Sequence, residues 1–140
     1  MKLIKDVIYI NAQNKDEFIR KLSKKVAESE LVEDDKVLVS ELLKRESVGS
    51  TLIEEGVAMP HVESFNVKVS SVVVVKTDSI VWQDGENNVD LVIVLLLKQN
   101  EDSKIKKQIQ MVVRKFADDE FVNKIRQIRV EEIQNILNRI

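Results

Sequence analysis

Two long apolar runs constrain the fold of this chain more than any other feature. One contains four consecutive valines within the stretch Val67 to Lys76, and the other is DLVIVLLLK, from Asp90 to Lys98. Continuous β-branched runs of this kind are typical of strands that are buried on both faces. The second run could instead form a helix, but its length and β-branching favour a strand. Two such strands need cover on both sides of a sheet, which helices can supply.

The rest of the chain supplies this cover. Shorter strands are predicted at Ile4 to Ile10, Val57 to Met59 and Ile80 to Trp82, with a polar turn at Asp84 to Asn88. Amphipathic helices are predicted over about 15–29, 35–45, 105–116, 121–128 and from about 130 onward. We therefore expect a single α/β domain over residues 1–140. Its predicted architecture is a three-layer sandwich, with a mixed β-sheet flanked by helices on both faces.

Composition argues against several classes of function. A net charge of −2 provides no basic field that could hold nucleic acid. The apolar run from Val89 to Leu97 contains Asp90 and is much shorter than the ~20 residues of a membrane helix, so we expect no membrane insertion. The N-terminus has no small-residue cleavage site typical of a signal peptide. A cytoplasmic location fits these features best.

Bound cofactors are not expected either. The chain has no cysteine and one histidine, which makes a zinc site improbable, so we expect no metal. It also has no GxxxxGK[ST] loop, so nothing supports nucleotide binding.

The segment from Arg45 to Glu63, RESVGSTLIEEGVAMPHVE, concentrates the unusual residues of the chain. It contains the only histidine, His61, directly after the only proline, Pro60. Proline has no N–H to donate, so we expect Pro60 to end the preceding strand and His61 to lie just past the strand end. There an imidazole is held by a rigid scaffold and can still face solvent. An unperturbed imidazole titrates near pH ~6.5, which makes it a candidate nucleophile. A surface histidine with no chemical role is the plain alternative.

Several neighbours of His61 in this segment suit phosphoryl chemistry. Arg45, at a predicted helix end, could form a bidentate pair with a phosphate, or it could simply serve the helix dipole. Ser50 and Thr51 could donate hydroxyls, although Gly-Ser-Thr is equally typical of a plain turn. Glu55 could orient the imidazole, or it could lie at a solvated edge. Phosphoryl transfer depends mainly on positioning and charge stabilisation, which these groups can provide.

The pattern R-E-x-x-G-S-T followed by G-V-A-M-P-H resembles the IIA domains of the mannitol/fructose class of the bacterial sugar phosphotransferase system. The stretch Ile80 to Val92 and the terminal helical region are similar to that family too, so the resemblance covers most of the chain. It implies a phosphotransferase whose His61 receives phosphate from the phosphocarrier HPr and passes it to a cysteine of a IIB domain during sugar uptake. Arg45 would steady the phosphoryl group, Glu55 would match an active-site acid of some members, and Thr51 would lie beside the site.

Two positions depart from the family pattern. Val62 follows His61 where many members carry glycine, and the second active-site histidine of many members is missing near Ile105 and Lys106. The alternative function is therefore a regulatory domain, either of a transcriptional activator or antiterminator or free-standing, in which phosphorylation of His61 signals sugar status. A third possibility is a binding module that keeps the fold without being phosphorylated.

Overall fold

The chain folds around one β-sheet in the computed structural model, which describes residues 3–83 and 87–140. Its elements, in chain order, are β1 (Ile4–Tyr9), α1 (Lys15–Glu28), α2 (Asp35–Val48), β2 (Leu52–Glu54), β3 (Val57–Ala58), β4 (His61–Ser64), β5 (Ser71–Gln83), β6 (Asn87–Lys98), α3 (Ser103–Phe116), α4 (Asp119–Gln127) and α5 (Val130–Leu137). The predicted turn at Asp84 to Asn88 lies outside the described residues over 84–86, and Asn87 and Asn88 belong to β6.

The two apolar runs form the centre of the sheet, as predicted. The strand order is β1-β5-β6-β3-β2, and β4 also pairs with β6. Strand β5 is antiparallel to β6, whereas β1 is parallel to β5 and both β3 and β4 are parallel to β6. The sheet is therefore mixed.

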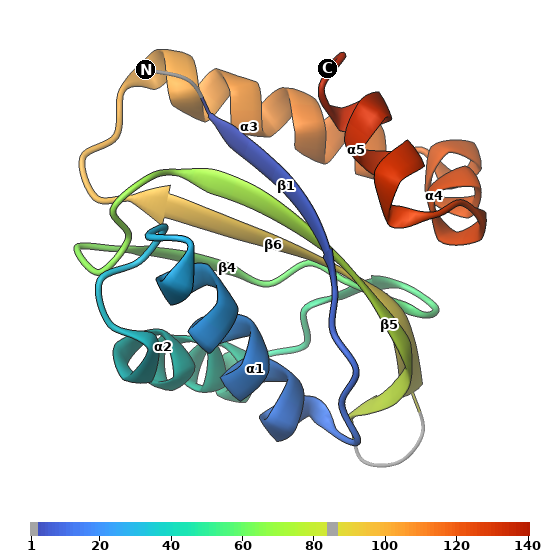
Figure 1. The fold of residues 1–140 in the computed structure, drawn as a ribbon, viewed down its shortest axis with the longest axis horizontal. Helices are drawn as coiled ribbons and strands as arrows, with labels where there is room; N and C mark the ends of the chain where they lie inside the picture. The colour runs from blue at the N-terminus through green and yellow to red at the C-terminus, as the bar shows by residue number, and fades with distance from the viewer. Residues whose placement is uncertain (1–2, 84–86) are drawn as a thin grey trace.

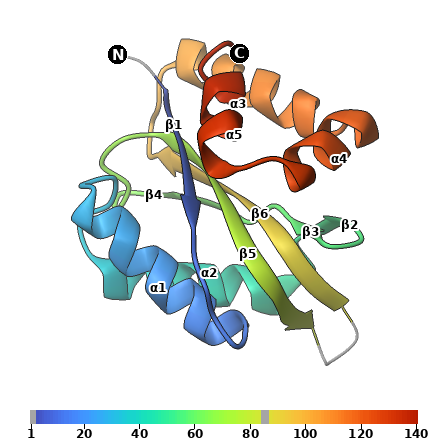
Figure 2. The ribbon, with the colours of Figure 1, turned by 45° about the vertical axis from the view of Figure 1, so that its right-hand side comes forward.

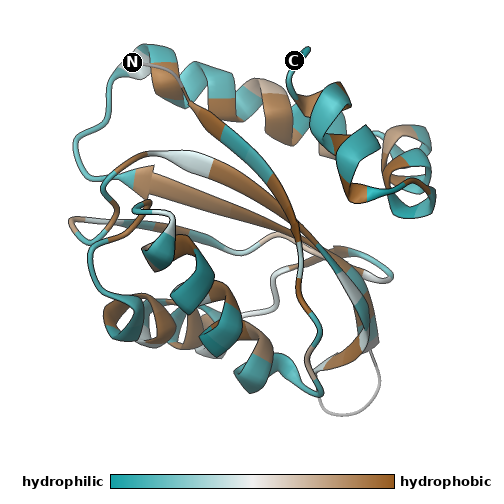
Figure 3. Cartoon of the chain, in the orientation of Figure 1, coloured by the Kyte–Doolittle hydropathy of each residue, from teal (hydrophilic) through white to brown (hydrophobic). Residues whose placement is uncertain are grey.

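Helices cover both faces of this sheet. Helices α1 and α2 lie on one side, and α3, α4 and α5 lie on the other (Figure 1). Successive residues of a strand point to opposite faces. Accordingly, Val73 and Val75 join the core beneath α1 and α2, whereas Val72 and Val74 join the core beneath the other three helices. Hydrophobic residues concentrate on these inward surfaces (Figure 3). The predicted three-layer α/β fold is confirmed.

The short strands differ from prediction. Strands β2 and β4 were not predicted. The run expected at Val67 to Lys76 becomes a strand only at Ser71, and together with the run expected at Ile80 to Trp82 it forms one strand, β5, with an irregularity between Lys76 and Ile80. Helix α2 also continues to Val48, past its expected end at Lys44 or Arg45. Strand β4 pairs with β6, which is far away in the sequence, whereas β2 pairs with the nearby β3.

The sequence predicted that His61 lies just past a strand end. In the structure it is instead the first residue of a further strand, β4. Strand β3 ends at Ala58, two residues before Pro60, and the Pro60 carbonyl accepts a hydrogen bond from the Leu95 N–H at 3.0 Å. The edge therefore resumes at once, with His61 in register with Leu95 of β6. The proline interrupts the ladder but does not end it.

The opposite edge of the sheet is covered by one side chain of α5. The Gln134 amide nitrogen donates to the Lys5 carbonyl at 2.9 Å, and its amide oxygen accepts from the Val7 N–H at 3.1 Å. This amide satisfies backbone groups of β1 that a neighbouring strand would otherwise bind.

Across the described ranges, no helix has both the length and the apolar character needed to span a bilayer.

Candidate functional site

His61 is exposed at the edge of the sheet, while the residues around it are fixed. Its backbone pairs with Leu95, and the next residue, Val62, is 7% exposed and packs in the core beneath α1 and α2. The side chain of Val62 therefore fills the interior. The imidazole is accessible on a rigid strand, which is the placement that a nucleophile requires.

A shallow hollow brings Arg45 and His61 together. It has a volume of about 350 Å³ and is lined by Glu41, Lys44, Arg45 and Val48 from α2 and by His61, Val62 and Glu63 from β4. The four helix residues follow helical spacing, so they share the face of α2 that is turned toward β4. The predicted pairing of Arg45 with His61 in one site therefore has a geometric basis.

Arg45 is lightly held in this hollow. One of its terminal nitrogens donates to the Gly49 carbonyl at 3.3 Å, and no carboxylate lies within ion-pair distance of it in the described part of the chain. A guanidinium has five N–H donors in a planar fork. Most of them are available to an incoming anion.

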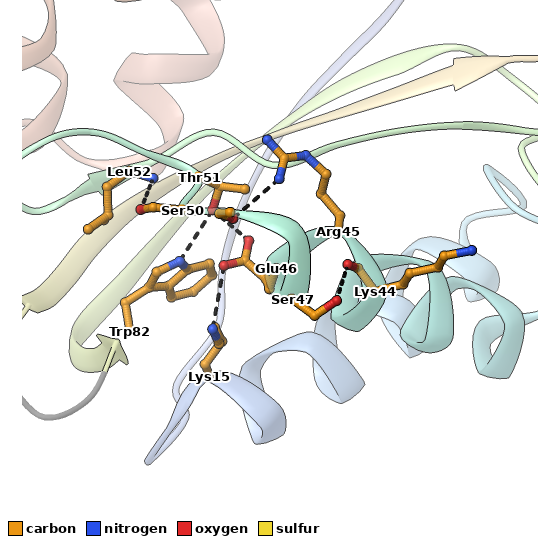
Figure 4. A network of polar contacts seen from close by, with 10 residues as sticks. Lys15, Lys44, Arg45, Glu46, Ser47, Ser50, Thr51, Leu52 and Trp82 are labelled. Carbon is orange, nitrogen blue, oxygen red and sulfur yellow. Dashed lines mark hydrogen bonds and ion pairs between the residues drawn. The ribbon is translucent and has the colours of Figure 1, made fainter.

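Neither Thr51 nor Ser50 is among the residues that line the hollow. Thr51 is 4% exposed, its hydroxyl donates to Glu46 Oε2 at 2.5 Å, and its oxygen accepts from the Trp82 indole N–H at 3.3 Å (Figure 4). Thr51 could donate directly to a phosphoryl group only if this hydroxyl left Glu46. Ser50 is different, because it is exposed and its oxygen accepts from the Leu52 N–H, which leaves its own proton available.

Glu55 is not brought to His61. It lies in the turn between β2 and β3, whereas His61 begins β4 farther along the edge (Figure 2). Val57 pairs with Leu91 and His61 with Leu95, so these two residues are roughly 13 Å apart along the sheet at about 3.3 Å per residue. Glu55 is exposed and lies beyond Val57.

The acids that do line the hollow are Glu41 and Glu63. Sequence reasoning missed Glu41, although its position one helical turn before Arg45 was a usable signal. One oxygen of Glu41 is buried without a hydrogen-bond partner in the described residues. The charges around the hollow are thus mixed, with Lys44 and Arg45 opposing Glu41 and Glu63.

Ile105 and Lys106, at the start of α3, have different environments. Ile105 is 4% exposed and belongs to the core, whereas Lys106 is exposed and lines a second hollow of about 260 Å³ with Glu63. Glu63 lines both hollows, so the hollow that contains Lys106 of α3 adjoins the one that contains His61. No group of three or more potential metal ligands occurs within residues 3–83 and 87–140.

Known proteins resemble this chain over nearly its whole length. Residues 2–140 match the family model described as phosphoenolpyruvate-dependent sugar phosphotransferase system, EIIA 2. The 2-O-α-mannosyl-D-glycerate-specific EIIABC component of the phosphotransferase system of Escherichia coli strain K12 is 30% identical over 83% of the chain. The chain spans 18% of the length of that relative.

Solved structures share the fold. Nitrogen regulatory protein IIA-Ntr from Neisseria meningitidis has a TM-score of 0.75 and 22% identity, with 94% of this chain and 91% of that one covered. Enzyme IIA-Mtl from Escherichia coli, solved in complex with phosphorylated enzyme IIB-Mtl, has a TM-score of 0.69 and 20% identity, with 95% and 94% covered. At these identities the two structures establish the fold alone.

Proposed function

The chain belongs to the EIIA 2 family of the phosphoenolpyruvate-dependent sugar phosphotransferase system, and from this premise we propose that His61 accepts a phosphoryl group from HPr and passes it to a cysteine of a IIB domain during sugar uptake. The observation that carries the proposal is the exposed imidazole on a rigid strand, in one hollow with a lightly held arginine. As a carrier in this pathway, the domain would work in the cytoplasm.

The proposed chemistry is a pair of phosphoryl displacements. A ring nitrogen of neutral His61 attacks phosphorus, and the donor leaves with the electrons of its bond to phosphorus, while the second ring nitrogen keeps its proton. A cysteine thiolate of the IIB domain then attacks the same phosphorus, and the imidazole leaves. No bound cofactor or metal is needed for either step.

Arg45 is the principal stabilising group in this scheme. Its free N–H donors can bind two oxygens of the phosphoryl group, and Lys44 adds a second positive charge. Ser50 can add a neutral hydrogen bond from its exposed hydroxyl. Glu41 and Glu63 oppose the same negative charge, and this repulsion favours onward transfer over storage of the phosphate.

The other two predicted site residues take less direct roles in the proposal. Thr51 acts through its buried contacts rather than as a ligand of phosphate. Glu55 contributes through the hairpin, where its carbonyl accepts from Arg126 at 3.2 Å.

The test is labelling with phosphoenolpyruvate that carries a labelled phosphoryl group, in the presence of HPr and the other general phosphotransferase proteins. We expect the wild-type chain to acquire label and His61→Ala to acquire none, with the far-ultraviolet circular dichroism of the variant unchanged. Label retained by folded His61→Ala would exclude His61 as the acceptor.

A second stage separates transport from regulation. Purified IIB domains are added to the labelled protein, and transfer of label to a IIB cysteine supports the carrier role. Label that stays on His61 with every IIB domain tested would instead favour the regulatory alternative. Absence of label on the wild-type chain would favour a binding module that is not phosphorylated.

A further inference from the structure

Arg45 and Glu46 are neighbours at the end of α2 but have opposite environments. Adjacent residues of a helix point about 100° apart. Arg45 lines the hollow, whereas the side chain of Glu46 is 4% exposed and points into the interior. Any contact that fixes the Glu46 carboxylate also fixes the helical turn that presents Arg45.

Glu46 is fixed by two partners. Its Oε2 accepts from the Thr51 hydroxyl at 2.5 Å, and its Oε1 lies 3.5 Å from the Lys15 ammonium at the start of α1 (Figure 4). The Trp82 indole N–H, from β5, completes the network by donating to the Thr51 oxygen. Every polar group of this buried cluster therefore has a partner.

Thr51 also reaches toward the nucleophile, through its backbone. Its carbonyl accepts from the Met59 N–H at 2.8 Å, and Met59 lies two residues before His61. One residue is thus joined by its side chain to the helix end that carries Arg45 and by its main chain to the strand that leads into His61.

We infer that Thr51 and Glu46 are positioning residues that set the separation between the Arg45 guanidinium and the His61 imidazole. The inference rests on the proposed phosphoryl transfer and adds to it two residues that do not touch the phosphoryl group. A small error in the placement of a stabilising group costs a large factor in rate.

A purely structural role accounts less well for the buried carboxylate. Buried ion pairs can often be replaced by apolar residues of similar size without loss of stability, so they are weak evidence for a stabilising role. Their best-attested use is to specify one geometry among several. Here the specified geometry is the join between α2 and the strand that precedes His61.

The experiment measures the initial rate of label transfer from phospho-HPr to His61. Thr51→Val removes the hydroxyl and keeps the side-chain volume, and Thr51→Ser keeps the hydroxyl. The matched control is Thr77→Val, because Thr77 is also buried, at 6% exposure, and its hydroxyl donates to a backbone carbonyl away from the site. Glu46→Gln keeps the shape of the acid and removes its charge, so it provides a second route to the same result.

We expect Thr51→Val to slow transfer by roughly tenfold or more, with Thr51→Ser and Thr77→Val close to the wild-type rate. Emission of Trp82, the only tryptophan, should shift in Thr51→Val, which reports loss of the indole contact.

A double-variant cycle with Arg45→Ala identifies the route of the effect. If Thr51 acts through Arg45, adding Thr51→Val to Arg45→Ala slows transfer by no more than about twofold further. The inference would be overturned if the rate effects of Thr51→Val and Arg45→Ala were fully additive, or if Thr51→Val and Glu46→Gln both kept the wild-type rate. In either case, labelling of the wild-type chain would leave the proposed function intact. If Thr51→Val fails to fold, Glu46→Gln replaces it in the cycle, and additivity with Arg45→Ala overturns the inference in the same way.

Discussion

The guanidinium of Arg45 is a strong anion-binding group, and among the described residues it makes one weak hydrogen bond. Its described bond, to the Gly49 carbonyl, is long at 3.3 Å and involves a neutral acceptor. A phosphoryl group on His61 would offer a charge-assisted and bidentate alternative. The arginine can therefore change partners at small cost when phosphate arrives.

Arg45→Lys tests the need for the planar fork. We expect transfer of label to His61 to fall by about tenfold, because a lysine keeps the charge and loses the bidentate geometry. The rate is measured from phospho-HPr, and the midpoint of urea unfolding should not change. Arg114→Lys, on an exposed part of α3, is the matched control. Equal rates for wild type and Arg45→Lys would remove Arg45 from the site.

The sequence predicts His61 and Arg45 as parts of one site, and the structure brings these two into one hollow, whereas the sequence left the placement of Thr51 and Glu55 open. His61 and Arg45 could be paired because each is chemically distinctive and both fall in one short segment of the sequence. The direction of Thr51 and Glu55 depends on how the hairpin is registered against β6, which local spacing does not reveal. Glu41 was missed although it lies one helical turn before Arg45, because this spacing alone does not distinguish a site residue from the other acids of a charged helix.

At the scale of elements, the β2–β3 hairpin is tied to the C-terminal helices by one arginine. Arg126 of α4 forms two bonds of 3.0 Å to the carboxylate of Asp90 and one to the Glu55 carbonyl. Gly56 has φ of 85°, and a β-carbon there would collide with the Arg126 guanidinium. The backbone needs glycine here for both its conformation and its lack of a side chain.

Gly56→Ala should therefore destabilise the protein. We expect a loss of about 1–3 kcal/mol in the free energy of unfolding, from the positive φ and from displacement of Arg126. Urea denaturation followed by circular dichroism measures the change. Gly49→Ala is the control, because its backbone is extended and a β-carbon there meets nothing within 4 Å. A loss in Gly49→Ala equal to that in Gly56→Ala would contradict this account.

An element could be predicted from the sequence when its own residues carry a clear pattern, and could not when it depends on pairing with another strand. The central parts of β5 and β6 were predicted because their side chains are continuously apolar, over residues 72–75 and 91–97. Helices α1 and α3 to α5 were predicted because their apolar residues recur at helical spacing. Strands β2 and β4 contain three and four residues, so they are too short for a periodic pattern. Strand β4 exists because β6 extends beyond Pro60 and offers four further residues for pairing.

At the scale of the whole molecule, one hydrogen bond joins the start of β5 to the loop before α3. The Ser70 hydroxyl donates to Glu101 Oε2 at 2.6 Å, and its oxygen accepts from the Lys98 N–H at 2.9 Å. This hydroxyl holds the pKa of the Glu101 carboxyl below its usual value, with a smaller contribution from the Asp102 N–H. A carboxyl whose pKa is lower in the folded state stabilises that state only while it is ionised.

The free energy of unfolding should therefore depend on Ser70 in a pH-dependent way. We expect Ser70→Ala to cost about 1 kcal/mol near neutral pH. The part of this cost that comes from Glu101 is fully present above the carboxyl pKa of the unfolded chain and disappears as the pH falls through the lower, folded value. Urea unfolding of both proteins across the acidic range measures the difference. Ser23→Ala is the control, since the buried Ser23 hydroxyl has no partner among the described residues. A cost that stayed constant down to the lowest pH would exclude the link to Glu101.

The amide of Gln134 determines where this sheet can recruit another strand. Another strand could pair with β1 over residues 5–7 only by displacing the Gln134 side chain, which already binds a main-chain donor and a main-chain acceptor there. Growth of the sheet is thus discouraged on that border. Among the described contacts no side chain hydrogen-bonds to the main chain of β4, so the border next to His61 lacks this obstacle.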